Sequence, residues 1–344
     1  MTEEERQQKS ECEQPGNPAP HSRPAARSLF GHYTFIDYAT QGYMALVGLI
    51  VLCWHGRLIP FWPRLLAAHV IGIALVDGLI RLHASRPSNR VLGLLRDFYP
   101  MLLYAGFYRE TGELNHVLAA GFLDPFFIRL EGRIFGLQPS LALMDWLPCP
   151  AVSELFYAAY FSYYVMVAGV GLALFYRNRE QFSHYLSVIS LLFYVCFLIY
   201  IFLPVQGPRV FFREFASCPL PADVQPLVAP VLPGAVQAGP FCRLMAWIYY
   251  AFDRPGAAFP SSHVAVAIGT VCFSFRYLRP IRWPHLVAVV LLCVATVYCR
   301  YHYVVDVMAG GVTAAVLIPL GNRLYFKFRN APQPEPPLRE SESS

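Results

Sequence analysis

Long apolar stretches, separated by short polar and basic loops, set the pattern of this chain. A helix needs about twenty apolar residues to cross the hydrocarbon layer of a bilayer. Eight stretches reach or approach that length: 35–54, 64–83, 98–118, 152–176, 184–203, 261–279, 284–300 and 303–324. The pattern therefore predicts an all-α fold, a polytopic membrane helix bundle of about eight spans.

The third of these stretches is the weakest candidate for a span. Arg109, Glu110 and Glu113 interrupt it, and charged side chains inside a bilayer are costly unless they have partners. The sequence leaves open whether this helix crosses completely or ends near Tyr108 and continues along the surface.

Two further segments combine aromatic residues with polar ones. Segment 119–150 is too polar to span, and the short run from Phe241 to Phe252 includes Trp247 and Tyr249. Such mixtures are typical of helices that lie in the membrane interface. We therefore expect one or two interfacial helices beside the bundle.

Both ends of the chain are polar and rich in proline. Residues 1–28 and 331–344 offer few apolar side chains for burial, which is typical of disordered segments. The sequence thus predicts disordered tails on either side of one membrane-embedded domain at 29–330.

Lysine and arginine collect in alternate loops and in both tails. The positive-inside rule places such loops in the cytoplasm, and both termini are expected there. The intervening loops, including 204–260 and 300–302, are then expected on the periplasmic, extracellular or lumenal side. The basic residues behind this assignment are Arg23, Arg27, Arg81, Arg86, Arg90, Arg96, Arg177, Arg179, Arg276, Arg279, Arg282, Arg323, Lys327 and Arg329.

The composition restricts the class of protein. Hydrophobic residues make up 56% of the chain and charged residues 14%, whereas about a quarter of the residues of a soluble domain are charged. The net charge of +5 arises from short loops, which indicates membrane orientation and argues against nucleic-acid binding. The nine cysteines show no metal-type spacing, and Cys218 and Cys242 share one long loop, so a disulfide between them stays open.

Two histidine motifs stand at the beginnings of successive apolar stretches. Residues 259–263 read Phe-Pro-Ser-Ser-His, and His302 is followed by Asp306 four positions later. An imidazole can attack phosphorus, a carboxylate one helical turn away can hold that ring, and a second imidazole can protonate a leaving oxygen. Each motif alone is more often an ordinary helix staple or helix cap. Because both fall on the same predicted side of the membrane, together they favour a phosphoryl-transfer site, in which the charge of Asp306 is expected to raise the pKa of His302.

A phosphate site also needs cations. Residues 206–209 read Gln-Gly-Pro-Arg directly after the fifth stretch, so a turn would direct the side chain of Arg209. Arg300 is the second candidate and Arg213 the third. A single interfacial arginine usually extends to the lipid headgroups. These three, however, flank the histidine motifs on the side where positive charge is normally scarce.

The motifs resemble the second and third signatures of the phosphatidic acid phosphatase type 2 superfamily, which includes membrane lipid phosphatases and, at a distance, vanadium haloperoxidases. The resemblance depends on 259–263, His302, Asp306 and Gly310. Residues 296–303, Thr-Val-Tyr-Cys-Arg-Tyr-His-Tyr, are most similar to the branch that contains inositol phosphorylceramide synthase, an inositolphosphotransferase group.

The likeness covers roughly 95–325, with a phosphatase-like core at about 150–325, and reaches upstream through Asp124 to Glu131 and on to Gly136. It implies that the domain at 29–330 is catalytic.

The resemblance implies a role for each site residue. His302 would form a phosphohistidine, Asp306 would orient it, and His263 would be the general acid. Ser262 and Ser261, with the neighbouring backbone, would bind phosphate oxygens.

The chain departs from the family pattern at two places. Where the third signature usually carries a Ser-Arg pair, this chain has Ala295 and Thr296, and where the first signature usually carries a lysine, it has Phe202. Arg300 is therefore expected to replace the missing guanidinium, beside Arg209.

The sequence thus predicts an integral-membrane lipid phosphatase or phosphotransferase that acts on a membrane lipid or lipid-linked phosphate, with transfer of an inositol-phosphate-type head group as the more specific expectation. Water and an alcohol are both open as acceptors. No metal or other cofactor is expected, since arginines and backbone dipoles can hold the phosphate charge. The alternatives are a membrane transporter, with Asp37, Asp77 and Glu154 along its pathway, and a non-catalytic membrane scaffold.

Overall fold

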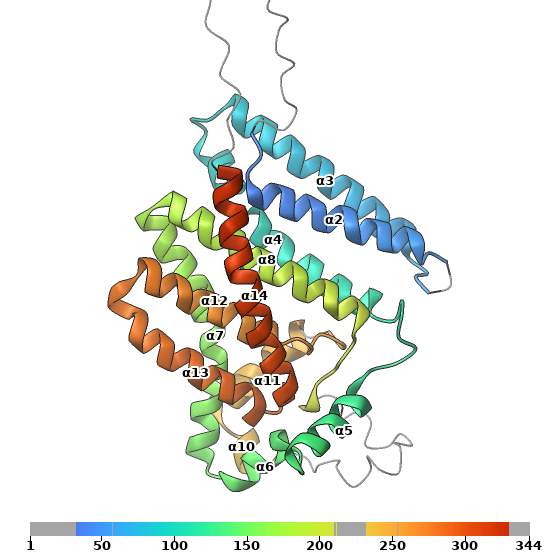
Figure 1. Ribbon diagram of the computed structural model, residues 1–344, viewed down its shortest axis with the longest axis vertical. Helices are drawn as coiled ribbons and strands as arrows, with labels where there is room; N and C mark the ends of the chain where they lie inside the picture. Colours follow the sequence, from blue (N-terminus) through green and yellow to red (C-terminus); the bar gives the residue numbers. More distant parts are fainter. Residues whose placement is uncertain (1–31, 57, 210, 212–231, 253, 330–344) are drawn as a thin grey trace, which may run out of the picture. The chain divides into compact units, whose positions relative to one another are not determined.

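The computed structural model describes residues 32–56, 58–209, 211, 232–252 and 254–329. Over these residues the chain is helical, with one isolated β-bridge and no strand (Figure 1). The expected all-α fold is confirmed. The two tails expected to be disordered, 1–28 and 331–344, lie outside the described residues.

Each of the eight apolar stretches forms a helix. Six of these helices, α2, α3, α7, α8, α13 and α14, are long and apolar enough to cross a membrane, which indicates an integral membrane protein. Of the other two, α4 is more polar, and α12, with 16 residues, rises only about 24 Å. Their bounds are α2 Phe35–Cys53, α3 Trp62–Ser85, α4 Arg90–Leu114, α7 Pro150–Arg177, α8 Arg179–Phe202, α12 Ser262–Tyr277, α13 Arg282–Tyr298 and α14 Val304–Arg329.

Helix α4 continues through Leu114 and does not end near Tyr108. Two acidic side chains near its end have partners on α3, and one of them, Glu113, lies 3.3 Å from Nη2 of Arg64. Glu110 is buried with its carboxylate 3.1 Å from Nε2 of His69. These pairings offset the cost of burying polar groups, and the last turns of α4 are packed, with Thr111 and Leu114 buried.

Short helices occupy the two segments expected at the interface. These are α5 (Asp124–Phe135) and α6 (Pro139–Trp146) in the first, and α10 (Gly234–Gln237) with α11 (Pro240–Phe252) in the second. Large apolar side chains remain exposed on them, among them Phe126, Trp146 and Trp247. The helices are therefore confirmed, whereas their location at a membrane interface stays a prediction.

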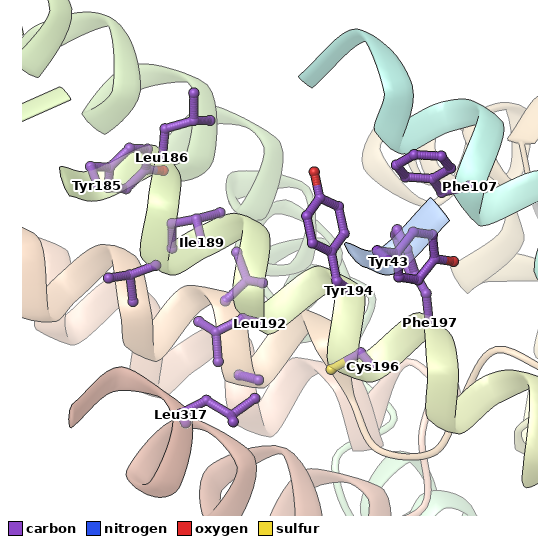
Figure 2. Packing of buried hydrophobic residues seen from close by; sticks show 14 of the residues in the cluster. Tyr43, Phe107, Tyr185, Leu186, Ile189, Leu192, Tyr194, Cys196, Phe197 and Leu317 are labelled. Atoms are coloured by element: carbon purple, nitrogen blue, oxygen red, sulfur yellow. The ribbon is translucent and has the colours of Figure 1, made fainter. Parts of the chain in front are cut away.

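Helix α8 is the central helix of the bundle and packs against α2, α4, α7, α12 and α14. Figure 2 shows its side chains pointing to several neighbours. Tyr194 points toward Tyr43 of α2 and Phe107 of α4, and Leu192 lies nearer Leu317 of α14. The ring of Tyr194 stacks on Tyr43 with the centroids 5.0 Å apart. A helix buried on all sides needs apolar residues all round, as the sequence of α8 provides.

The helices alternate in direction, so the bundle has two distinct ends. At one end, ion pairs join Asp97 of α4 to Arg179 of α8 and Glu180 of α8 to Arg329 of α14. At the other end lie the loops that carry the histidine motifs. The basic loops and the histidines are thus at opposite ends, as the sequence predicts, and which end faces the cytoplasm stays a prediction.

Cysteine labelling in sealed vesicles with the cytoplasmic side outward tests that orientation. Cys149, which is exposed at the histidine end, and an Arg279→Cys variant at the basic end would each be the single reactive thiol, with the other accessible cysteines replaced by serine. An impermeant maleimide should label the Arg279→Cys protein directly and Cys149 only after detergent is added, because the basic loop faces the cytoplasm. Direct labelling of Cys149, with labelling of the Arg279→Cys protein only after detergent is added, would show the opposite orientation.

Candidate functional site

His263 and His302 lie side by side, although they are 39 positions apart in the chain. Nε2 of His302 is 3.5 Å from Nδ1 of His263, and the ring centroids are 5.6 Å apart. His302 is buried and His263 is partly buried. The two motifs that the sequence singled out therefore form one site.

A tight turn after α13 delivers His302 to the beginning of α14. The backbone N–H groups of Tyr301 and His302 both donate to the carbonyl of Thr296, each at 3.0 Å. Arg300 takes a left-handed conformation in this turn, with φ 61°. The turn is thus closed by backbone hydrogen bonds that fix where His302 leaves it.

Asp306 caps α14 and also lies against the ring of His302. Its Oδ2 accepts a hydrogen bond of 2.9 Å from the backbone N–H of Tyr303, which caps α14. The same oxygen lies 3.4 Å from Nδ1 of His302. The helix-cap interpretation is correct, and it does not exclude an orienting role.

The Ser261–His263 motif opens α12 against the beginning of α14. The hydroxyl of Ser261 caps α12 by accepting from the N–H of Val264 at 3.3 Å, and the backbone N–H of Ser261 donates to the carbonyl of Asp306 at 3.0 Å. A Cβ at Gly310 would lie 2.5 Å from the carbonyl oxygen of Ser261. Only glycine permits this approach, which holds the two histidines together.

Arg209 reaches the site through a second close approach. Gly207 has φ +86°, and a Cβ there would lie 2.5 Å from the carbonyl oxygen of Tyr301. The backbone N–H of Arg209 donates to the carbonyl of Arg300 at 2.6 Å, and its Nη1 donates to the hydroxyl of Tyr301 at 2.9 Å. The structure therefore brings Arg209 against the turn that carries His302.

Arg300 is placed differently from Arg209. Its side chain is buried, and its charged and polarisable neighbours are Asp145, Tyr157 and Tyr298, on α6, α7 and α13. Burial lowers the pKa of its guanidinium. Its role as a phosphate ligand, like that of Arg209, Ser261 and Ser262, stays a prediction.

Burial decides the protonation of His302. It lowers the pKa of the ring to about 4, and the carbonyl of Ala258 only partly opposes this effect. We expected the charge of Asp306 to raise this pKa, whereas in the folded protein the loss of solvent lowers it. The ring is therefore neutral at physiological pH, the form in which it can act as a nucleophile.

Two buried carboxylates of α5 hold the loops of the site. Asp124 accepts from the backbone N–H groups of Gln206 and Gly207, each at 2.9 Å, and from the hydroxyl of Tyr303 at 3.0 Å. Glu131 accepts from the N–H of Val305 at 3.2 Å. Helix α5 thus joins the Arg209 loop to the beginning of α14, beside which it lies in Figure 1.

The sequence resemblance extends through these two acids, but it gives them no role in the site. Their signal is their spacing, since two acids seven positions apart lie on one face of a helix whose other residues are largely apolar. Burial raises the pKa of each carboxyl to about 7.

Tyr160 of α7 is a further contact that the sequence does not reveal. Its hydroxyl lies 3.2 Å from Nε2 of His263 and also contacts the hydroxyl of Tyr249 on α11. Its ring stacks on Tyr301, with centroids 4.3 Å apart. No motif signals this residue, because one tyrosine among many in an apolar helix looks like a core residue.

An apolar cavity of about 310 Å³ reaches the site from among α4, α7, α8 and α11. Its lining is mostly aromatic and includes Tyr108, Tyr163, Phe197 and Tyr249, and it ends at Ser262 and His263.

Cys242, on the same helix as Tyr249, is a free and buried thiol. Cys218, its expected disulfide partner, lies outside the described residues.

The fold and site together define a polytopic membrane protein with a His–His–Asp constellation at one end of its bundle. A family model described as PAP2 superfamily matches residues 126–320, more than half of the chain. The protein belongs to the PAP2 superfamily, whose members are generally phosphoryl-transfer enzymes. No curated protein and no solved structure matches the chain. The match covers every predicted site residue, whereas α2, α3 and α4 lie outside it.

Replacing Gly310 by alanine should separate the two histidine motifs. The new methyl group would force the turn before α12 away from α14, and a misplacement of about 1 Å can lower an enzymatic rate about 100-fold. We expect Gly310→Ala to lower both the melting temperature and the rate of phosphoryl transfer, the rate by at least about tenfold. Gly311→Ala is the matched control, because a Cβ at Gly311 meets no atom within 4 Å. Equal activity in the two variants would contradict this role of Gly310.

The α5 carboxylates should make stability depend on pH. Because the pKa of Asp124 and Glu131 is about 7 in the folded protein and about 4 in an unfolded chain, folding favours their protonated forms. Their contribution to stability is therefore complete below about pH 4 and is lost as the pH rises through 7. We expect the melting temperature in detergent to fall by a few degrees from pH 6 to pH 8. The double variant Asp124→Asn, Glu131→Gln has no ionisable group at these positions, so its melting temperature should fall less between pH 6 and pH 8. An unchanged fall would show that these two groups do not cause the pH dependence.

Proposed function

We propose that this protein is an integral-membrane phosphoryl-transfer enzyme, a lipid phosphatase or phosphotransferase, that works through a phosphohistidine at His302. The observation that carries the proposal is the contact between Nε2 of His302 and Nδ1 of His263, with Asp306 against the opposite nitrogen of His302. A nucleophile, its orienting carboxylate and a general acid are the groups that such a transfer requires.

In the first half of the reaction, Nε2 of His302 bonds to phosphorus while the bond from phosphorus to the leaving oxygen breaks. His263 gives its Nδ1 proton to that oxygen. In the second half, water or an alcohol attacks the phosphohistidine, and His263 accepts the proton of the attacking O–H group. One site can thus hydrolyse or transfer, depending on which acceptor reaches it.

The phosphate oxygens would be held by cations and by backbone dipoles. Arg209 lies against the His302 turn, and the N-terminus of α12, which begins at Ser262, carries the partial positive charge of the helix dipole, which favours an anion. Ser261 and Arg300 complete the proposed set. These groups can stabilise the charge that develops on the transferred phosphoryl group.

A lipid or lipid-linked phosphate is the proposed substrate. The cavity that ends at Ser262 and His263 is lined mainly by aromatic and aliphatic side chains, so a hydrocarbon chain can lie there while its phosphate reaches the histidines. Because the cavity meets His263, the proposed general acid, the chain in it belongs to the leaving alcohol. An inositol-phosphate head group is the more specific proposal, and it rests on the likeness of residues 296–303 to the inositolphosphotransferase branch.

The transporter alternative gains no support from its three acids. Asp37 is bonded to Arg96 and Tyr99, Asp77 to Tyr33 and Arg81, and Glu154 to the backbone at the beginning of α11. Each carboxylate therefore has partners that account for its position, and together these acids show no path across the bundle.

The proposal is tested with purified protein in detergent without added metal. Release of phosphate, or exchange of head groups, is measured over a panel of lipid phosphates. His302→Ala should lower turnover by several orders of magnitude, because the covalent intermediate cannot form. His263→Ala should lose less with an aryl phosphate, whose leaving group needs little protonation.

His55→Ala, at an exposed histidine outside the site, is the control, and size-exclusion chromatography reports folding. A well-folded His302→Ala protein with near wild-type turnover would refute the proposed nucleophile.

A further inference from the structure

The second ring nitrogen of His263 faces a tyrosine. Nδ1 of His263 lies toward His302, and Nε2 lies 3.2 Å from the hydroxyl of Tyr160. Tyr160 is fully buried. Its hydroxyl therefore has no bulk water to bond, and its partners are the groups that the fold places beside it.

The general acid needs a mobile proton on one particular nitrogen. A neutral imidazole carries one proton and a cationic one carries two. For His263 to give and take a proton at Nδ1, which faces His302, the proton on Nε2 has to stay in place in both states. If Nε2 were bare, loss of the Nδ1 proton would leave an imidazolate anion, which is far too basic to form in a buried site.

We propose that Tyr160 is a positioning residue whose hydroxyl accepts a hydrogen bond from the Nε2–H group of His263 and thereby keeps the mobile proton at Nδ1. Tyr160 would serve His263 as Asp306 serves His302, but with a neutral acceptor in place of a carboxylate. This inference rests on the proposed function for its place in the reaction, whereas the protonation pattern itself is a property of the resting protein.

The surroundings of Tyr160 suit an acceptor. Its hydroxyl contacts that of Tyr249, to which it can donate its own proton while it accepts from His263. Its ring is held by stacking on Tyr301 at 4.3 Å with an interplanar angle of 18°. The ring of His263, the proposed donor to Tyr160, packs against Tyr163 with centroids 4.6 Å apart. Both partners of the hydrogen bond are thus fixed by aromatic packing.

The proton balance closes over the two halves of the reaction. When the anionic phosphate binds, His263 takes up a second proton from solvent, because a neighbouring negative charge favours the cationic ring. It then passes the Nδ1 proton to the leaving oxygen as the phosphorus–oxygen bond breaks and the bond to His302 forms. It is then neutral and keeps its Nε2 proton, which is donated in a hydrogen bond to the hydroxyl of Tyr160. The O–H group of the acceptor returns a proton to Nδ1 as its oxygen bonds to phosphorus and the phosphorus–nitrogen bond breaks. Tyr160 gains and loses no proton.

The first test is spectroscopic and needs no turnover. Protein labelled with ¹⁵N in the histidine rings is studied by NMR in detergent, and the His263 signals are assigned from their absence in His263→Gln. Neutral His263 should carry its proton on Nε2 in the wild type, and Tyr160→Phe should populate both tautomers, because the acceptor is gone while the ring remains. A wild-type ring protonated on Nδ1, or an unchanged tautomer in Tyr160→Phe, would overturn the proposal.

The second test is kinetic. Tyr160→Phe should lower kcat for an alkyl phosphate by about 10-fold to 100-fold, a fraction of the full effect of a general acid, with KM little changed and an aryl phosphate less affected. Tyr185→Phe is the matched control, because Tyr185 is also buried and its hydroxyl donates to the carbonyl of Val167 on α7, away from His263. Equal losses for alkyl and aryl substrates, or equal losses in the two variants, would reduce Tyr160 to a packing residue.

The two proposals fail separately. A wild-type protein with the Nε2 tautomer but no phosphoryl transfer on any substrate would refute the proposed function and leave the role of Tyr160 in place. A fully active protein with the Nδ1 tautomer would refute the role of Tyr160 alone.

Discussion

The close approach of two backbone segments, the turn before α12 and the beginning of α14, is the constraint on which the site depends. The N–H of Ser261 donates to the carbonyl of Asp306, and a side chain at Gly310 would meet the Ser261 carbonyl at 2.5 Å. His263 directly follows the first segment, and His302 directly precedes the second. The separation of the two rings is therefore set by backbone contact and not by long flexible side chains, which gives the precision that catalysis requires.

Burial of charge is the second determinant of the geometry of the site. Asp124 and Glu131 are buried, so no solvent stabilises their carboxylates. Backbone N–H groups of the Arg209 loop and of α14 donate hydrogen bonds to them instead. An unpaired buried carboxylate is costly, so α5 is stable only where these donors converge on it. The same bonds fix the loop that carries Arg209 against the turn that carries His302. A helix outside the bundle core thus determines the geometry of the site.

The two histidines differ in what contacts their outer nitrogens. A carboxylate oxygen lies 3.4 Å from His302, and a tyrosine hydroxyl lies 3.2 Å from His263. An anion favours a positive charge on the ring beside it, whereas a hydroxyl orients a ring without stabilising one charge state so strongly. This asymmetry suits the proposed roles, since the nucleophile becomes positively charged when it bonds to phosphorus and the general acid alternates between two charge states.

The sequence by itself determined the helices, because bilayer thickness requires long apolar runs, and it indicated the histidines, because polar groups at the ends of such runs need a reason to be there. It also placed His302 and Asp306 one helical turn apart. It could not assign Tyr160, Asp124 or Glu131 to the site, since a tyrosine or an acid in a helix carries no spacing signal toward partners that are 82 or more positions away along the chain. Nor could it decide that α4 continues past Tyr108, or that burial lowers the pKa of His302. Those outcomes depend on which side chains share an enclosed volume, and only the tertiary structure decides that.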